Sequence, residues 1–533
     1  MKVVFPDKYS FDQLFTFSGL EGRTDYANML TLLSQKERFT YWPMLPVRSG
    51  SIRIPDFDGP IVVCSDFASF GPNRMLLADA WNLLIDGEAT LNGFDDGAYE
   101  IVRVDRRILL APNGFLHTEF LTADFNALLE KKQRAFDVLQ SFPDMESDER
   151  AKAVVRACAV LRSCVYSPEE KFRHLWVTPD RWPHRHCWIM DSVYQALGLQ
   201  YFDKRAACDA ICALFDHQEP CGKVPMTVFP GYAAPAMIQQ PVIANGLKAI
   251  DAPDDVIEFA LPHLTAFIDW VLQHRDLDGD GILEWMTLGY DKLCPCGESG
   301  MDNSPRFDGG RICGAVDLTC FISRECEVIA EFAQRLGKAD VGEKYTDIHE
   351  RLNSLIENKL WNDDMEFYSD FDVISRKPTM VSAVSGFLPL LCGAASKEHA
   401  ARLAAHVLNP KTYGTFYPLP SVSVSDPRFE LDMWRGPVWH IFNYHVAEGL
   451  DRYGFHSEAE HIRRKTVEAG LRYYNEFGGF FEFYDPFGEL PPGRINRKGQ
   501  NIPEGEEWLH RAVHDYGWSA AVFLDMLHKL KRQ

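Results

Sequence analysis

The sequence predicts a mainly α protein, a closed ring of helical hairpins preceded by a β-rich domain, and a change of periodicity is the main evidence. Up to about residue 120, short segments rich in β-branched and apolar residues alternate with turn signals, as in SGSIRIPDF, GPIVVCSDF and YEIVRVDRRILLAPNGF. From about Phe125, apolar residues recur at i, i+3, i+4 and i+7. We therefore expect an N-terminal β-rich domain at residues 1–120 and a helical domain at residues 121–533.

The helical domain is predicted from about a dozen amphipathic segments that no strand pattern of comparable length interrupts. A βαβ sheet is disfavoured for that reason, and the lack of a fixed sequence repeat favours a closed ring over a solenoid. The main segments are residues 125–142, 149–165, 203–217, 254–275, 319–337, 342–361, 380–392, 397–409, 438–454, 457–477 and 515–532.

Composition and charge exclude several classes of partner. The 533 residues carry a formal charge of -21, which disfavours nucleic acid and anionic membrane surfaces. The N-terminus MKVVFPDKYSFDQ has no apolar signal region and no stretch approaches the length of a membrane span, so we expect a cytoplasmic protein. The 13 cysteines lack framework spacing, which favours reduced thiols, and Cys294-Pro295-Cys296 has no second pair for a metal or redox site.

Long connections rich in aromatic and acidic residues join the predicted helices, and such loops are usually functional. We expect them to meet on one face, where aromatic platforms and carboxylates suggest a sugar site. Motifs for phosphate loops, dinucleotide binding, zinc proteases and serine hydrolases are absent from the sequence. The connections are residues 166–188, 219–240, 276–308, 409–439 and 478–515.

Several motifs of the helical domain occur in the order seen in glycoside hydrolase family 63. They are RHLWVTPDRWPHRHCWIMDSVYQALGL, DLDGDGILEW, ESGMDNSPRFD, DMWRGPVWHIFNY, FFEFYDP and YGWSAA, and they span about residues 165 to 525. The chain resembles this family there, whereas the β-rich domain carries none of the motifs. The resemblance implies an (α/α)6 barrel, a relationship to the trehalases of family 37, and hydrolysis of α-glucosidic or related α-glycosidic bonds with inversion.

The resemblance implies that Asp302 in ESGMDN is the general acid and that Glu482 in FFEFYDP is the general base. Inverting hydrolysis needs one carboxylic acid to protonate the leaving oxygen and one carboxylate, roughly 6.5–9.5 Å away, to activate water. Outside its motif, an aspartate in such a Gly/Ser/Pro-rich loop is usually a turn former. The neighbouring Glu298 and Asp308 are expected to be structural or sugar-binding.

Further substrate contacts follow from the same resemblance. Trp188, Asp191 and Ser192 match the family's W-x-W-D-S pattern, which departs here at Met190, where a tryptophan is common. That departure puts the shape of the sugar pocket in question. Arg306 or Arg435 could meet a carboxylate of the substrate. The remaining predicted subsite residues are Gln240, Trp434, Trp439 and Trp518.

The segment from Asp276 to Glu284 resembles most of a calcium-binding loop without reference to any family. Asp276, Asp278 and Asp280 stand at positions 1, 3 and 5, Ile282 at position 7 and Glu284 at position 9. Position 12 is a threonine, so another carboxylate would have to complete the site. We expect a structural calcium that braces the loop leading to Asp302, and no cofactor for the chemistry.

The predicted function is an inverting α-glycosidase acting on a small α-glucoside or α-mannoside. The TPDRWPHR segment and the expected location resemble bacterial members that hydrolyse glucosylglycerate or mannosylglycerate, whereas Met190 and the extra domain leave a short α-gluco-oligosaccharide open. Two alternatives remain at this point: a catalytically silent carbohydrate-binding protein, and a phosphorylase or lyase on the same helical ring. The sequence does not indicate an oligomeric state.

Overall fold

The structure is a computed structural model that describes most of the chain. The described residues are 3–7, 14–34, 40–43, 50–55, 59, 61–94, 97–142, 147–181, 183–232, 235–288, 293–499 and 511–530.

The N-terminal part contains two antiparallel sheets. The first has the strand order β1-β2-β3-β4-β9 and the second the order β10-β11-β8-β7-β6-β5. In the second sheet the β10–β11 hairpin pairs Tyr99 with Pro112, and the segments predicted as strands near residues 52, 62, 102 and 109 are all found. The strands are β1 Leu14–Thr16, β2 Thr31–Ser34, β3 Thr40–Pro43, β4 Ser51–Arg53, β5 Ile61–Val63, β6 Phe67–Phe70, β7 Asn73–Leu77, β8 Leu83–Asp86, β9 Thr90–Asn92, β10 Tyr99–Val104 and β11 Arg107–Pro112.

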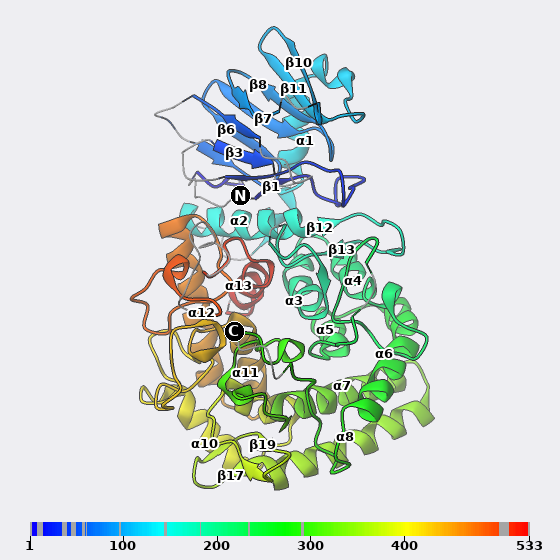
Figure 1. The fold of residues 1–533 in the computed structure, drawn as a ribbon, viewed down its shortest axis with the longest axis vertical. Coiled ribbons are helices and arrows are strands. Elements are labelled where there is room, and N and C mark those ends of the chain that lie inside the picture. The colour runs from blue at the N-terminus through cyan, green and yellow to red at the C-terminus, as the bar shows by residue number, and fades with distance from the viewer. Residues whose placement is uncertain are drawn as a thin grey trace.

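Helices α2 to α13 form six hairpins that close into an (α/α)6 barrel, as predicted. Helices α3, α5, α7, α9, α11 and α13 contact one another in turn, and α13 returns to α3. The other six lie outside them, and Figure 1 shows α2, α4, α6, α8, α10 and α12 following one another around the ring. The helices are α1 Phe125–Arg134, α2 Asp148–Cys164, α3 Ile189–Leu199, α4 Lys204–Cys212, α5 Ile243–Ala249, α6 Asp254–His274, α7 Val316–Arg335, α8 Ala339–Leu360, α9 Pro389–Cys392, α10 Lys397–Leu408, α11 His440–Arg452, α12 His456–Phe477 and α13 Gly517–Leu530.

Burial separates the two layers of the barrel. Every residue of α3 is buried, whereas the outer α8 buries only a stripe of its surface. A helix that is apolar all round must lie inside a protein, and an amphipathic one on its surface. Where α3 meets α13, Gly198 allows the closest approach, because a Cβ there would lie 2.6 Å from the Cα of Ala521. This contact closes the ring.

One predicted helix is wrong. The segment from Met380 to Cys392 is extended at first and then forms a 3-10 turn at Val384–Phe387 and the single-turn α9. Pro389 has no N–H and so starts a new helix instead of continuing one, and Gly393, at φ +78°, ends it. Helices α3 and α5 were not among the predicted segments. Short strands lie between helices: β12 Val165–Tyr166, β13 Trp176–Val177, β14 Cys187–Trp188, β15 Thr227–Val228, β16 Cys313–Gly314, β17 Trp361–Asn362, β18 Phe367–Tyr368, β19 Phe371–Asp372 and β20 Lys377–Pro378.

The β-rich region sits beside α2 at one edge of the barrel (Figure 1). Gly19 N donates to Val165 O at 2.8 Å, and the buried Arg162 of α2 pairs with Glu21 at 2.6 Å. Lys132 of α1 pairs with Glu21 at 2.9 Å and with the buried Asp66. These buried polar contacts join the two parts of the chain. The boundary at residue 120 stays a prediction, and it falls between β11 and α1.

Candidate active site

The predicted site residues gather at one end of the barrel. Each inner helix follows an outer one in its hairpin, so the inner helices run in the same direction and their N-termini lie at the same end. Residues 166–188 lead into α3, residues 276–308 toward α7, and residues 478–515 into α13. The remaining long connections lead into α5 and α11. The long connections therefore meet there, as predicted.

Asp302 lies in a loop that internal contacts hold firmly. Glu298 is fully buried and accepts hydrogen bonds from the backbone N–H groups of Ile238 and Met286, at 2.8 and 2.6 Å. It also pairs with Arg275 at 2.6 Å. Its role is structural, one of the two expected for it. The side chain of Asp302 remains 20% exposed and lies 2.6 Å from the ammonium of Lys498.

Glu482 lies in a buried extended segment beside the one that precedes α13. Its backbone N–H donates to Val513 O at 2.9 Å, and its side chain is only 3% exposed. The carboxylate Oε2 accepts a hydrogen bond from Arg497 Nε at 3.0 Å. A buried carboxylate needs such a partner, because an unpaired one would be costly to desolvate.

The two predicted catalytic carboxylates contact consecutive residues, Arg497 and Lys498. Consecutive Cα atoms lie 3.8 Å apart across a trans peptide, so one short segment brings Asp302 and Glu482 into the same site although 180 positions separate them in the sequence. Asp432 holds this segment by accepting from the N–H groups of Lys498 and Gly499, each at 2.8 Å. Lys498 itself has a positive φ of 60°.

Two buried polar groups at the start of α3 have no partner among the described residues. They are Oδ1 of Asp191, in the first turn of α3, and Nε1 of Trp188. Burial raises the pKa of Asp191 well above its usual range, and the negative charges of Asp180 and Glu482 add to the effect. Native proteins rarely leave buried polar groups unsatisfied. Both atoms belong to residues predicted to bind substrate, and that role stays a prediction.

Met190 and Gln240 pack under the loop of the predicted acid. A Cβ on Gly300, which has φ +72°, would lie 2.5 Å from the sulfur of Met190 and 3.2 Å from Nε2 of Gln240. Gln240 donates to Ser299 O at 2.8 Å and is fully buried. Met190 therefore supports the loop that carries Asp302, and substrate contact by Gln240 stays a prediction.

The predicted tryptophans form a buried stack next to Glu482. Trp434 and Trp439 stack with ring centroids 3.7 Å apart, and Trp518 meets Trp439 edge-on at 5.7 Å. Nε1 of Trp518 donates to Glu482 O at 3.4 Å. Because Trp434 and Trp439 are each 1% exposed, their place is in the packing behind the site, which does not favour the direct sugar contact predicted for them.

The position of Arg306 does not support the predicted substrate contact. Its guanidinium is fully buried and pairs with Asp317 at 2.5 Å and with Asp370 at 2.6 Å. Its charge is neutralised inside the protein, so we now assign it a structural role. Ser192 is also fully buried, with its Oγ 3.4 Å from the sulfur of Cys187, and this placement favours a structural role too.

Arg435 lies at the mouth of the site. It pairs with Asp308 at 2.8 Å and with Glu430, and it donates to Asn303 O at 3.2 Å, next to Asp302. Asp308 thereby supports the same loop and has a structural role. Arg435 keeps 17% of its side chain exposed, which leaves it accessible to a substrate.

Sequence reasoning missed Arg497 and Lys498. They lie in RINRKGQ, between the FFEFYDP and YGWSAA motifs, and only the presence of two adjacent cations in a long polar connection pointed to them. Although burial alone would lower the pKa of Lys498, the adjacent Asp302 carboxylate raises it above its usual range. Lys498 is therefore a cation at neutral pH.

The aspartates of the predicted calcium loop do lie together. Single carboxylate oxygens of Asp276, Asp278 and Asp280 are all within 4.8 Å of one another. Glu284 is buried, with Oε2 accepting from Leu277 N at 2.7 Å and Oε1 without a partner among the described residues. Burial raises the pKa of Glu284 to about 8, and the negative aspartates add to this. Lys359 Nζ lies 3.2 Å from Oδ2 of Asp280, and Arg376 Nη1 lies 2.8 Å from Oδ2 of Asp278.

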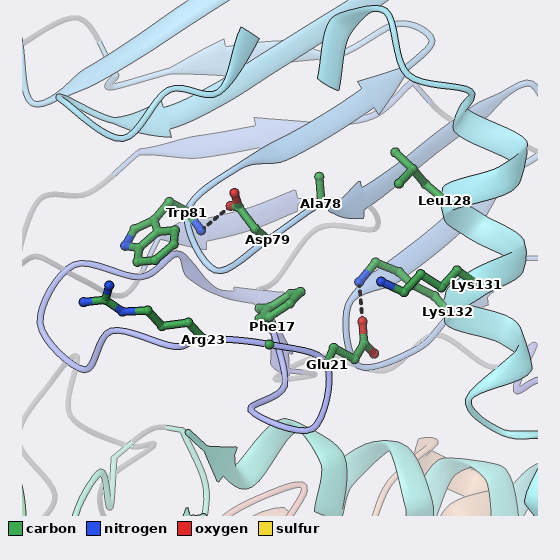
Figure 2. Close-up of a pocket in the computed structure, with 10 residues that line it drawn as sticks. Phe17, Glu21, Arg23, Ala78, Asp79, Trp81, Leu128, Lys131 and Lys132 are labelled. Atoms are coloured by element: carbon green, nitrogen blue, oxygen red, sulfur yellow. Dashed lines mark hydrogen bonds and ion pairs between the residues drawn. The ribbon is translucent and has the colours of Figure 1, made fainter. Parts of the chain in front are cut away.

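A separate cavity of about 250 Å³ lies in the N-terminal part of the chain. Figure 2 shows it between Trp81, Phe17 and the side chains of α1, with the ion pair of Glu21 and Lys132 at one side. None of the residues predicted for catalysis or substrate binding lines it. None of the described helices is both long and apolar enough to cross a membrane.

An (α/α)6 barrel with this site is the framework of a class of glycoside hydrolases, and comparisons with known proteins place the chain in that class. The model of the mannosylglycerate hydrolase MGH1-like glycoside hydrolase domain matches residues 184–519, well over half of the chain. The protein belongs to this family, which lies within glycoside hydrolase family 63 and is related to the trehalases.

Individual relatives agree with this assignment. Mannosylglycerate hydrolase MGH1 of Selaginella moellendorffii is 27% identical over 402 residues, covering 60% of this chain and 79% of the relative. The mannosylglycerate hydrolase of Thermus thermophilus is 26% identical over 399 residues, covering 59% and 92%. A crystal structure of a GH63 mannosylglycerate hydrolase from Thermus thermophilus in complex with glucose matches with a TM-score of 0.56 and 25% identity, over 69% and 98% of the two chains.

The relationship to trehalases is visible in the fold. Neutral trehalase Nth1 from Saccharomyces cerevisiae matches with a TM-score of 0.51 at 17% identity, over 66% of this chain and 73% of the trehalase. The predictions of the family and of the barrel are thus confirmed, and the protein is a glycoside hydrolase.

Proposed function

We propose that this glycoside hydrolase cleaves a small α-mannoside or α-glucoside of glycerate with inversion, using Asp302 as the general acid and Glu482 as the general base. The observation that carries the proposal is the pairing of these two carboxylates with the consecutive residues Lys498 and Arg497. Oδ1 of Asp191, which has no partner among the described residues, provides a hydrogen-bonding group for a sugar hydroxyl.

In the proposed reaction the proton of Asp302 passes to the glycosidic oxygen as the bond to the anomeric carbon breaks. Glu482 takes a proton from a water molecule, whose oxygen attacks the anomeric carbon from the opposite face. Glycerate leaves with its new O–H, and the sugar carries the oxygen of water in the inverted configuration. With only 3% of its side chain exposed, Glu482 is shielded from bulk solvent.

An anionic aglycone fits the charges at the mouth of the site. Lys498 and Arg435 are both partly exposed there, on a protein whose overall charge is -21. A substrate carboxylate that binds Lys498 would compete with Asp302 for its ammonium. Relatives named as mannosylglycerate and glucosylglycerate hydrolases support the same substrate class.

The test compares mannosylglycerate and glucosylglycerate with the neutral analogue glucosylglycerol, for the wild type and for Lys498→Met. We expect the variant to lose about 30-fold or more in kcat/KM on the glycerate substrate, since losing one partner of a desolvated charge pair costs about 2 kcal/mol or more, and to lose far less on glucosylglycerol. Equal cleavage of neutral and anionic substrates by the wild type would favour a short α-gluco-oligosaccharide. Binding without turnover, a requirement for phosphate, or an unsaturated product would contradict hydrolysis.

We also propose that calcium binds the loop of Asp276, Asp278 and Asp280, with Glu284 and the carbonyl of Ile282 as further ligands. The buried oxygen of Glu284 that lacks a partner among the described residues supports this donor set, and oxygen ligands suit calcium. The ion would brace the connection that leads to Asp302.

Calcium is expected to raise the melting temperature of protein pretreated with a chelator. A ligand at 100 times its Kd stabilises the folded state by about 2.7 kcal/mol, enough for a measurable shift. Differential scanning calorimetry with calcium, with magnesium and with chelator measures it, and Asp276→Asn should abolish the calcium effect. An equal shift in that variant, or no shift in the wild type, would mean that Lys359 and Arg376 neutralise the loop instead.

A further inference from the structure

Glu482 is the end of a chain of hydrogen bonds that joins three distant segments. Arg497 Nε donates to Glu482 Oε2 at 3.0 Å, and Arg497 Nη2 lies 2.8 Å from His184 Nε2. His184 Nδ1 lies 2.9 Å from Asp180 Oδ2, while the other oxygen of Asp180 accepts from the backbone N–H of His184 at 2.8 Å. The side chain of Asp180 is fully buried and that of Arg497 is 10% exposed.

The chemistry of the four groups sets the direction of every hydrogen bond in the chain. A guanidinium is always protonated and only donates, so Nε2 of His184 must accept from it. The single ring proton of a neutral imidazole then sits on Nδ1 and is donated to Asp180. A doubly protonated His184 would turn a second cation toward Arg497 and break their contact.

Both ends of the chain are anchored in the barrel. Pro179 O accepts from the N–H of Gly517 at the start of α13 at 2.8 Å, and Arg181 donates to Val165 O at 2.6 Å, so Asp180 is fixed between them. At the other end, Asn496 O accepts from Met433 N at 3.0 Å, and Asp432 holds the residues that follow Arg497. The guanidinium therefore has little freedom once His184 has fixed its orientation.

We propose that Arg497 is a positioning residue that aims the carboxylate of Glu482, and that His184, oriented by Asp180, holds Arg497 in place. The Arg497 guanidinium donates to Oε2 of Glu482. No described residue donates to Oε1 of Glu482, so this oxygen can accept from the attacking water. This inference rests on the proposed role of Glu482 as the base. Neither Arg497 nor His184 exchanges a proton with substrate.

The test compares kcat and its pH profile in Arg497→Met, Arg497→Lys, His184→Leu and His184→Gln. Arg497→Met is expected to lower kcat about 100-fold and His184→Leu about 10-fold, because removing a group that orients a reacting one commonly costs 10- to 100-fold. Both variants are expected to move the acid limb of the pH profile to higher pH and to change KM little. Lysine keeps the charge, and the glutamine amide oxygen keeps an acceptor for Arg497, so these variants should recover much of the loss. None of the variants replaces the other titratable groups around this chain of hydrogen bonds. These groups are Asp191, Asp302, Tyr516, Arg185 and His186.

A double variant and a matched histidine separate positioning from general destabilisation. His184→Leu should cost nothing further in the Arg497→Met background, because it acts through Arg497. The control His174→Gln removes another His–Asp pair, which His174 makes with Asp216 at 3.1 Å, and should leave the pH profile unchanged.

Additive losses of kcat in the double variant would overturn the inference. So would an acid limb of the pH profile that does not move, or a rise in KM in place of the fall in kcat. The proposed function fails separately, if replacing Glu482 itself leaves the enzyme active.

Discussion

Asp302→Asn is expected to lower kcat on a glycerate glycoside by about 10²- to 10⁴-fold, because asparagine has no proton to give to the leaving oxygen. The loss should depend on the leaving group. An α-glycosyl fluoride releases fluoride, which needs little help from an acid, so the variant should retain most of its activity on that substrate. Proton NMR of the product during the first turnovers should show the β-anomer in every case.

Asp308→Asn is the matched control for Asp302→Asn. It changes a carboxylate of the same loop that pairs with Arg435 and is expected to keep most of the activity. Equal losses on the fluoride and on the natural type of substrate would remove Asp302 from the role of acid. Initial release of the α-anomer by the wild type would overturn inversion, and with it the assignment of both carboxylates.

Glu482→Ala is expected to be as inactive as the acid variant on every substrate, the fluoride included. Without a base, water is not deprotonated as it attacks, and a good leaving group does not replace that step. Azide carries no proton to remove and fits the space that the shortened side chain vacates. We therefore expect azide to restore turnover of the fluoride and to yield the β-glycosyl azide, which NMR identifies.

Glu489→Gln controls for the loss of a nearby acid, since Glu489 is exposed and lies seven positions further along the chain. It should behave as the wild type. An α-glycosyl azide, or full activity of Glu482→Ala without azide, would move the base to another carboxylate. Asp191 is then the first to consider, because it lies close enough to Glu482 for their charges to interact.

The fold was largely predictable because the spacing of apolar residues within a segment indicates which face of a helix is buried. The outer helices α6, α8 and α12 each bury one apolar face, and the predicted segments match these helices closely. Helix α3, which is buried all round, was not among the predicted segments. The segment at Met380 failed for a different reason, since Pro389 interrupts an apolar run that is otherwise compatible with a helix.

The site was predictable in part. Asp302 and Glu482 stood out through their motifs, and Asp191 through its place after Trp188. The roles of the tryptophans and of Arg306 were less accessible, because a tryptophan or arginine in a functional motif can face the ligand or support the residues that do. Trp439 and Arg306 turned out to be buried, and only their neighbours reveal that.

The sequence by itself determined the class of this protein: a glycoside hydrolase barrel after a β-rich domain, with two named acids as its candidate catalysts. Tertiary structure alone decided which cations face those acids. Arg497 and Lys498 are adjacent in the chain, yet one contacts Glu482 and the other Asp302, while His184 reaches Arg497 from more than 300 positions away. Motifs record the residues of one segment, whereas the charge around a buried carboxylate is set by whichever segments the fold packs against it.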